Sequence, residues 1–305
     1  MAILKLKPAC KDYPWGGRRL AEEFGIEYDK TILAEAWLLS CHKDGLSTLE
    51  NGETLSDYIK SKGAKVLGTN CHFKDCPIII KLIDAKENLS VQVHPPDDYA
   101  LAHENQLGKR EMWYILDSEE NSVLYCGFNK KISRDEFISR IKDNSLIEVL
   151  NPIHAKKGDV IFIPPGTVHA IGKGILTAEI QTNSNITYRI YDYGRNRPLH
   201  INQALDVTNF NPIDVRRENY QHLVACDYFV VDKLVLDGKF LSEAGGIVDE
   251  KTFLSVVIID GEGKISCGDE EFYYRKGESY FLTANSGDWK IKGTCHALLT
   301  TLPPL

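Results

Sequence analysis

The sequence GDVIFIPPGTVH, residues 158–169, says most about how this chain folds. Its VIFI run at 160–163 is β-branched and aromatic, which predicts a short buried strand. The Pro-Pro-Gly triplet at 164–166 predicts a tight turn, because proline presets φ and glycine adopts positive φ without strain. A strand that ends in such a turn would be followed closely by His169. The stretch therefore predicts a β fold with a histidine just beyond a strand and a tight turn.

The rest of the chain repeats this alternation of strand and turn. Short β-branched or aromatic runs, bounded by Gly, Pro, Asn and Asp, lie at Ile78–Ile83, Trp113–Leu116 and Phe253–Ile259. Helices are expected at fewer places, namely after the capping box that begins at Ser133, at Leu55–Lys62 and at Asp97–Glu104. Many strands and few helices predict a mainly β sandwich or barrel with inserted helices.

A domain boundary is expected in the polar, irregular stretch TNFNPIDVRRENYQ at 208–221. We predict a larger β domain over 1–215, with a helical insertion near 130–150, and a smaller β domain over 216–305. The sequence GESYFLTANSG at 277–287 repeats the glycine, acid, strand and turn of the opening stretch but lacks its histidine. The second domain is therefore expected to be a related β fold without a metal.

Composition and charge narrow the possible functions. The 305 residues include 36 Lys and Arg against 43 Asp and Glu, and the net charge of −7 argues against a general nucleic-acid-binding protein. No apolar run approaches the roughly 18 residues that a membrane helix needs. The N-terminal sequence lacks the apolar core of a secretory signal, so we expect a cytoplasmic protein that binds neither membrane nor nucleic acid. Eight cysteines without a C-x-x-C pair do not predict a thiolate zinc site.

Four residues in three segments could together hold a metal ion. Gln92 and His94 are two apart in SVQVH, so on a strand both side chains point the same way. Glu111 opens the apolar run EMWYIL, and His169 ends the opening stretch. Each of them alone is explained equally well as a turn or surface residue. Together, two imidazoles, a carboxylate and an amide oxygen form a mixed site that suits zinc or another first-row divalent ion.

The spacing of residues 158–169 resembles the second motif of the cupin superfamily. The stretches 80–95, 108–114 and 178–193, together with Trp15-Gly16-Gly17, resemble the type I mannose-6-phosphate isomerases, also called phosphomannose isomerases. The resemblance is good from about residue 10 to residue 205 and looser beyond. It implies that 1–215 is a catalytic cupin or jelly-roll barrel and that the smaller domain is jelly-roll-like.

The resemblance implies an aldose–ketose isomerase that interconverts mannose 6-phosphate and fructose 6-phosphate. It further implies one Zn²⁺ per chain, with Gln92, His94, Glu111 and His169 as its ligands. The sequence departs from the usual cupin pattern in three ways. A glutamine replaces the first histidine, sixteen residues separate His94 from Glu111, and Lys173 stands where an asparagine is common. Because an amide is a weak ligand, Gln92 is the one that water could replace.

The implied reaction moves a proton between C1 and C2, so it needs a base and a stabilised enediolate. By resemblance, Arg189 in the Tyr-Arg pair is the active-site arginine, and Lys109 is a lysine of the substrate pocket. Glu179 is the expected base, with His103 or a lysine as alternatives. Asn185 stands where the family often has aspartate, which argues against a role for that position.

A phosphorylated sugar also requires local positive charge in this acidic chain. We expect Ser90, Lys81 and Lys109 to bind the phosphate. Further cations are available at Arg110, Lys173, Arg195 and Arg197.

Two other functions stay open at this point. An iron-dependent cupin oxygenase would use two histidines and one carboxylate without Gln92, but it would not explain Lys109 and Arg189. A sugar-sensing cupin would bind a ligand and a partner protein without catalysis, and it would tolerate the loss of the metal. For the isomerase, the expected partner is a small phosphosugar, and the protein is expected to be a monomer or a homodimer.

Overall fold

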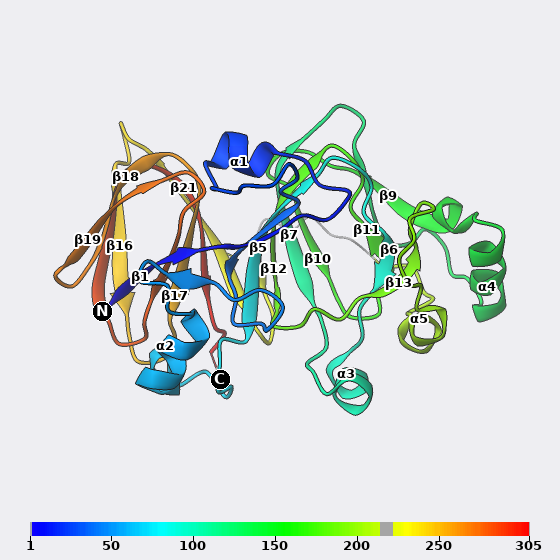
Figure 1. Ribbon diagram of the computed structural model, residues 1–305, viewed down its shortest axis with the longest axis horizontal. Coiled ribbons are helices and arrows are strands. Elements are labelled where there is room, and N and C mark those ends of the chain that lie inside the picture. The colour runs from blue at the N-terminus through cyan, green and yellow to red at the C-terminus, as the bar shows by residue number, and fades with distance from the viewer. Residues whose placement is uncertain (1, 214–221, 305) are drawn as a thin grey trace.

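The computed structural model, which describes residues 2–213 and 222–304, is built around three antiparallel β-sheets (Figure 1). The six-stranded sheet has the order β10 (Val160–Ile163), β7 (Glu111–Ser118), β12 (Ile175–Thr182), β5 (Ile78–Ala85), β3 (Glu35–Leu39) and β2 (Ala9–Lys11). The five-stranded sheet has the order β13 (Tyr188–Tyr191), β6 (Val91–Val93), β11 (His169–Ala170), β8 (Val123–Phe128) and β9 (Leu150–His154).

The third sheet has ten strands. Its main path is β14 (Val224–Ala225), β15 (Val230–Asp237), β21 (Gly287–Thr301), β17 (Leu254–Asp260), β20 (Ser279–Leu282), β1 (Ile3–Lys7) and β4 (Thr48–Leu49). Three further strands lie off this path: β16 (Glu243–Val248) and β18 (Glu262–Cys267) pair with β21, and β19 (Glu270–Arg275) pairs with β18. The fold is thus mainly β with a cupin-type barrel, as the sequence predicts.

Short helices decorate the sheets. They are α1 (Arg19–Phe24), α2 (Leu55–Lys62), α3 (Asp97–Glu104), α4 (Arg134–Lys142) and α5 (Ile201–Val207), with 3₁₀ turns η1 (Ala64–Leu67) and η2 (Leu146–Val149). The Ser133 hydroxyl accepts a hydrogen bond from the Glu136 amide at 3.0 Å, so the predicted capping box begins α4. No helix within the described residues is long and apolar enough to cross a membrane.

The six-stranded sheet is buried on both faces. Its inner face meets the five-stranded sheet around a core that includes Ile83, Trp113 and Cys126. Its outer face carries Ile80, which belongs to a second core shared with Phe281 of the ten-stranded sheet. Every residue of β5 and β12 is accordingly buried, so polar residues of these strands such as Lys81 and Glu179 also lie in the interior. The C-terminal sheet therefore covers apolar surface of the barrel.

The N-terminal strand β1 lies in the C-terminal sheet, where Ile3 pairs with Leu282 and Leu6 pairs with Ser279 (Figure 1). This pairing joins the two ends of the chain, and the order of elements along the sequence does not predict it. The predicted boundary between 215 and 216 lies outside the described residues, so the division into 1–215 and 216–305 stays a prediction.

Candidate active site

His94, Glu111 and His169 converge in the interior between the two barrel sheets. His94 directly follows β6, Glu111 is the first residue of β7, and His169 is the first residue of β11. All three are buried, and their possible ligand atoms lie within 4.8 Å of one another. Glu111 Oε2 lies 3.5 Å from His94 Nε2, and Glu111 Oε1 lies 3.3 Å from His169 Nε2. The structure thus brings three of the four predicted metal ligands to one point.

The Pro-Pro-Gly turn explains why the two histidines meet. Gly166 has φ 81°, which a residue with a side chain rarely adopts. Its amide donates to the His94 carbonyl at 2.8 Å, so the turn is fastened to the end of β6. His169 then pairs with Gln92 across the β6–β11 ladder. The turn therefore sets His169 beside the strand that carries Gln92 and His94.

Both imidazoles are held in the tautomer that a metal site needs. His94 Nδ1 donates to the Ile186 carbonyl at 2.7 Å, and His169 Nδ1 donates to the Thr167 carbonyl at 2.8 Å. Because a carbonyl only accepts, the proton must be on Nδ1, and in the neutral ring the lone pair is then on Nε2. His94 Nε2 and both oxygens of Glu111 are buried and have no hydrogen-bond partner among the described residues. These atoms fit a divalent cation.

Electrostatics supports the same protonation states. Burial, followed by the charge of Lys109, lowers the pKa of His94 to about 3. Burial also lowers the pKa of His169. Burial alone would raise the pKa of Glu111, but chiefly the charge of Lys109 holds it well below its usual range. Two neutral imidazoles and one carboxylate result, which is the charge state in which these side chains bind metals.

Gln92 lies beside this group and is half-buried. Its Nε2 is 3.3 Å from His169 Nε2, and its Oε1 accepts a hydrogen bond from the Ser90 hydroxyl at 3.3 Å. In this orientation the amide nitrogen faces His169. Binding a metal through Oε1 would therefore require the side-chain amide to rotate so that its oxygen and nitrogen exchange places. This rotation leaves the backbone unchanged. Ser90, a predicted phosphate contact, is buried directly behind Gln92.

An alternating chain of buried charges leads away from Glu111 across the six-stranded sheet. Lys109 Nζ lies 2.8 Å from Glu111 Oε2 and 3.9 Å from Glu179 Oε1. Lys81 Nζ lies 3.1 Å from Glu179 Oε1 and 3.8 Å from Glu35 Oε2. The five side chains therefore alternate in sign, and all are buried. Burial alone would lower the pKa of Lys81, but Glu179 and Glu35 hold it above its usual range.

Arg189 shares the inner face with Gln92, its cross-strand partner on β6. Its guanidinium is half-buried and donates to the Pro198 carbonyl at 3.1 Å, outside the chain of charges. Within the part of the chain that the structure describes, the buried Arg189 Nε has no hydrogen-bond partner. Nearby, Arg197 donates two hydrogen bonds to the buried Asp192, at 2.7 and 2.6 Å. The GRNR segment is thus anchored by Asp192.

Two of the other candidates lie apart from the cluster. His103 is exposed on α3, where it stacks on Tyr99 with ring centroids 4.0 Å apart. Arg110 points away from its neighbours Lys109 and Glu111, since its guanidinium lies 2.9 Å from both Asp97 and Asp227. These two residues are therefore poor candidates for the base and the phosphate contact.

Three residues of the site escaped the sequence prediction. Trp113 Nε1 donates to Glu179 Oε2 at 2.9 Å, and its ring meets His169 edge-on with centroids 5.5 Å apart. Glu35 and Trp37 lie at the far end of the charge chain. Trp113 could have been found, because it is two residues after Glu111 on a strand and must share its face.

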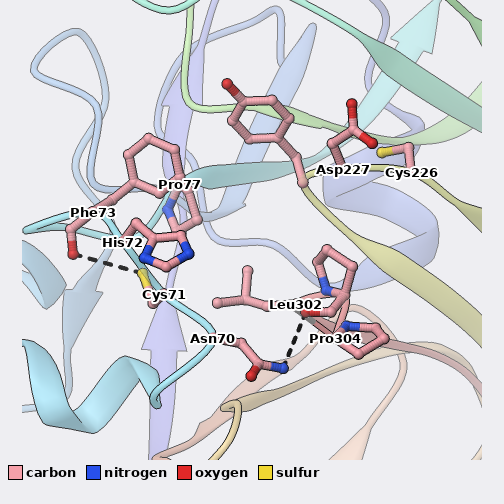
Figure 2. Close-up of a pocket in the computed structure, with 11 residues that line it drawn as sticks. Asn70, Cys71, His72, Phe73, Pro77, Cys226, Asp227, Leu302 and Pro304 are labelled. Atoms are coloured by element: carbon pink, nitrogen blue, oxygen red, sulfur yellow. Dashed lines mark hydrogen bonds between the residues drawn. The ribbon is translucent and has the colours of Figure 1, made fainter.

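A separate cavity of about 270 Å³ opens elsewhere on the molecule (Figure 2). Figure 2 shows it between the loop at 70–77, the segment 226–228 and the C-terminal residues 302–304. None of the predicted site residues lines it. It is therefore distinct from the buried metal-ligand cluster.

Comparison with known proteins gives a consistent result. Residues 3–123 match the model of the phosphomannose isomerase type I catalytic domain, and residues 219–302 match that of the mannose-6-phosphate isomerase cupin domain. The chain is 34% identical to mannose-6-phosphate isomerase ManA of Bacillus subtilis (strain 168), with 98% of each chain covered. It is 34% identical to the mannose-6-phosphate isomerase of Streptococcus mutans, with 92% of each covered.

The fold agrees with these sequence matches. The crystal structure of the mannose 6-phosphate isomerase from Bacillus subtilis superposes with a TM-score of 0.89 at 32% identity. The match covers 98% of this chain and 99% of that one. With the candidate metal site of His94, Glu111 and His169 in the same fold, the chain belongs to the type I mannose-6-phosphate isomerases, a family of cupin-fold enzymes.

Proposed function

We propose that this enzyme interconverts mannose 6-phosphate and fructose 6-phosphate with one zinc ion held by His94, Glu111, His169 and Gln92. The observation that carries the proposal is the buried cluster of His94 Nε2 and the Glu111 oxygens, which have no hydrogen-bond partner among the described residues beyond the ion pair of Glu111 with Lys109, at one end of a chain of charged side chains. Two imidazoles and a carboxylate with an added amide oxygen suit zinc. When bound, such an ion polarises the sugar oxygens at C1 and C2 as a Lewis acid.

Glu179 is the proposed base. Trp113 Nε1 and Lys81 Nζ fix its two oxygens at 2.9 and 3.1 Å, so its carboxylate is oriented before substrate arrives. Glu179 would take the proton from C2 of the open-chain aldose and return it to C1, while the hydroxyl proton on O2 passes to O1, which yields the ketose. Lys109 lies between Glu179 and Glu111, where its ammonium group would stabilise negative charge on the enediolate. Arg189 would add a second fixed cation on the opposite sheet.

Ser90, Lys81 and Lys109 remain the proposed phosphate contacts. Ser90 adjoins Gln92 and Lys109 adjoins Glu111, so both border the metal ligands. Lys81 already pairs with two carboxylates, so a phosphate would have to share its ammonium group. The cytoplasmic location and the monomeric or homodimeric state stay predictions.

Replacing Glu179 by glutamine tests the assignment of the base. Glutamine keeps the shape and an oxygen for Trp113 Nε1 but cannot accept the C2 proton. We expect kcat to fall by about 10²- to 10⁴-fold, the usual contribution of a general base, while zinc content stays at one per chain. Steady-state kinetics and metal analysis of the same preparation measure both quantities.

Glu120→Gln, at an exposed carboxylate in the turn before β8, is the matched control and should leave kcat unchanged. If Glu179→Gln loses zinc in proportion to activity, Glu179 supports the metal site and is not the base. If it keeps full activity, another residue moves the proton.

A further inference from the structure

Side chains from β12 and from β3 hold Lys81 from two sides, and only the contact with Glu179 on β12 is part of the proposed reaction. On the β12 side, Glu179 is its cross-strand partner. On the β3 side, Trp37 is its cross-strand partner, and Glu35 is two residues earlier on the same face. Lys81 Nζ lies 4.7 Å from the centre of the Trp37 ring and 3.8 Å from Glu35 Oε2. The β3 side chains therefore hold Lys81 opposite Glu179.

Glu35 is itself held in place by Trp37. The indole Nε1–H donates to Glu35 Oε2, with the two atoms 2.6 Å apart, and this hydrogen bond is buried. The bond orients the carboxylate toward the barrel interior, where it pairs with Lys81. Since a carboxylate without a partner would be costly to bury, the indole and the ammonium group together account for the position of Glu35.

Trp37 in turn has little freedom to move. It is fully buried, and its carbonyl accepts a hydrogen bond from the Ser47 hydroxyl at 2.9 Å. Gly45 packs against the ring so closely that a Cβ on Gly45 would lie 2.6 Å from Trp37 Cε3. The ring is therefore fixed by the loop that follows β3. An orienting contact that is itself immobile can set the position of a side chain to a fraction of an ångström.

We infer that Glu35, oriented by Trp37, is a positioning residue that fixes the ammonium group of Lys81 beside Glu179. The inference rests on the proposed function, because it assigns Lys81 to the support of the base. Without Glu35, Lys81 keeps only Glu179 as a full ionic partner on this side of the sheet and moves toward it. That movement changes the geometry of the base and leaves the metal ligands untouched.

The kinetic test uses Glu35→Gln and Trp37→Phe, alone and combined. Glutamine still accepts from the indole but cannot pair with Lys81, and phenylalanine keeps a ring under Lys81 but cannot orient Glu35. We expect each to lower kcat by roughly tenfold, since small misplacements of a catalytic group have effects of this order or larger, with KM changed less than twofold. The double variant should lose no more than Glu35→Gln alone, because Trp37 acts through Glu35. Zinc content and affinity should equal those of the wild type.

Three results would overturn the inference. The first is an unchanged kcat in Glu35→Gln. The second is a double variant whose kcat falls by the product of the two single effects. The third is a fall in zinc affinity that accounts for the lost activity. Glu50→Gln, at an exposed carboxylate that follows β4, is the control and should behave as wild type.

A second readout does not depend on turnover. We expect the shift in urea midpoint of the Glu35→Gln, Lys81→Met double variant to be smaller than the sum of the single shifts, because the Glu35 charge that Lys81→Met alone leaves without its partner is absent from the double variant. Additive shifts would show that Glu35 does not hold Lys81. If the wild type fails to isomerise mannose 6-phosphate, the proposed function fails, while this cycle still tests the pairing.

Discussion

Glu111 is the residue whose surroundings point most directly to a cation. It is fully buried, and neither oxygen has a hydrogen-bond partner among the described side chains and backbone. Lys109 compensates its charge from 2.8 Å on one side, and the Nε2 atoms of His94 and His169 face it on the other. A carboxylate in such a place is costly unless a positive charge meets both oxygens. A divalent ion between the three residues would meet this requirement.

Zinc should therefore stabilise the folded chain, and Glu111→Gln should abolish that effect. At a hundredfold excess over its Kd, a ligand that binds only the folded state adds about 2.7 kcal/mol. For a chain of this size we expect Tm to rise by roughly 5 °C. Differential scanning calorimetry with and without zinc measures the rise in the wild type, in Glu111→Gln and in the exposed control Glu87→Gln.

The control should show the full rise and Glu111→Gln none. An equal rise in all three proteins would place the zinc elsewhere, and the proposed ligand set would be wrong.

At the same scale, the sequence reveals residues that carry a motif and misses those defined only by pairing. His94, Glu111 and His169 stand in recognisable spacings, and the structure brings them together. Glu35 and Trp37 stand in no motif. They reach Lys81 only because β3 pairs with β5 in one particular register, and a shift of one residue would turn both side chains away. Local sequence does not determine which residues pair with each other across a sheet.

At the scale of elements, local sequence was sufficient to predict a helix where the chain carries a signal for the start of that helix. Helices α2 and α3 occupy the ranges that their sequences predict, and α4 begins at its capping box. The short helices α1 and α5 were missed, since neither has a capping side chain or, as α3 has in Pro96, a proline at its N-cap. For six or seven residues, packing against the barrel decides whether a helix forms. The prediction thus succeeded for elements with their own start signals.

The Pro-Pro-Gly turn shows how one element can organise a site. Its Gly166 amide is bonded to His94, and its end leads directly into His169. The turn therefore fixes the position of β11 relative to β6 without the help of any long side chain. This local structure explains why a twelve-residue stretch predicts both a β fold and one member of the candidate metal site, His169.

At the scale of the whole molecule, the C-terminal sheet serves as the outer cover of the barrel. Ile80 and Met112 on the outer face of the six-stranded sheet share one core with Phe281 of the C-terminal sheet and with Phe253, which directly precedes β17 of that sheet. Because β1 also joins that sheet, both ends of the chain contribute to it. The sequence predicts two β domains. It does not predict that β1 pairs within the C-terminal sheet, because pairing between distant segments leaves no pattern in the local sequence.

Phe253→Ala tests this shared core. Phe253 is fully buried and stacks on Phe281 with ring centroids 4.8 Å apart. Truncation of a buried phenylalanine costs about 3–5 kcal/mol, so the urea midpoint should fall markedly. Phe240→Ala is the matched control, because Phe240 is 85% exposed and should leave the midpoint unchanged. Similar midpoints for the two variants would show that the cover contributes little to stability.

The central claim is that turnover of mannose 6-phosphate depends on the buried metal site. The most direct measurement is a coupled assay for fructose 6-phosphate on the purified chain as isolated, after chelation, and after zinc is added back. We predict turnover that chelation abolishes and zinc restores. No fructose 6-phosphate from fully zinc-loaded protein would contradict the isomerase assignment. Turnover that survives complete metal removal would contradict the metal site formed by His94, Glu111 and His169.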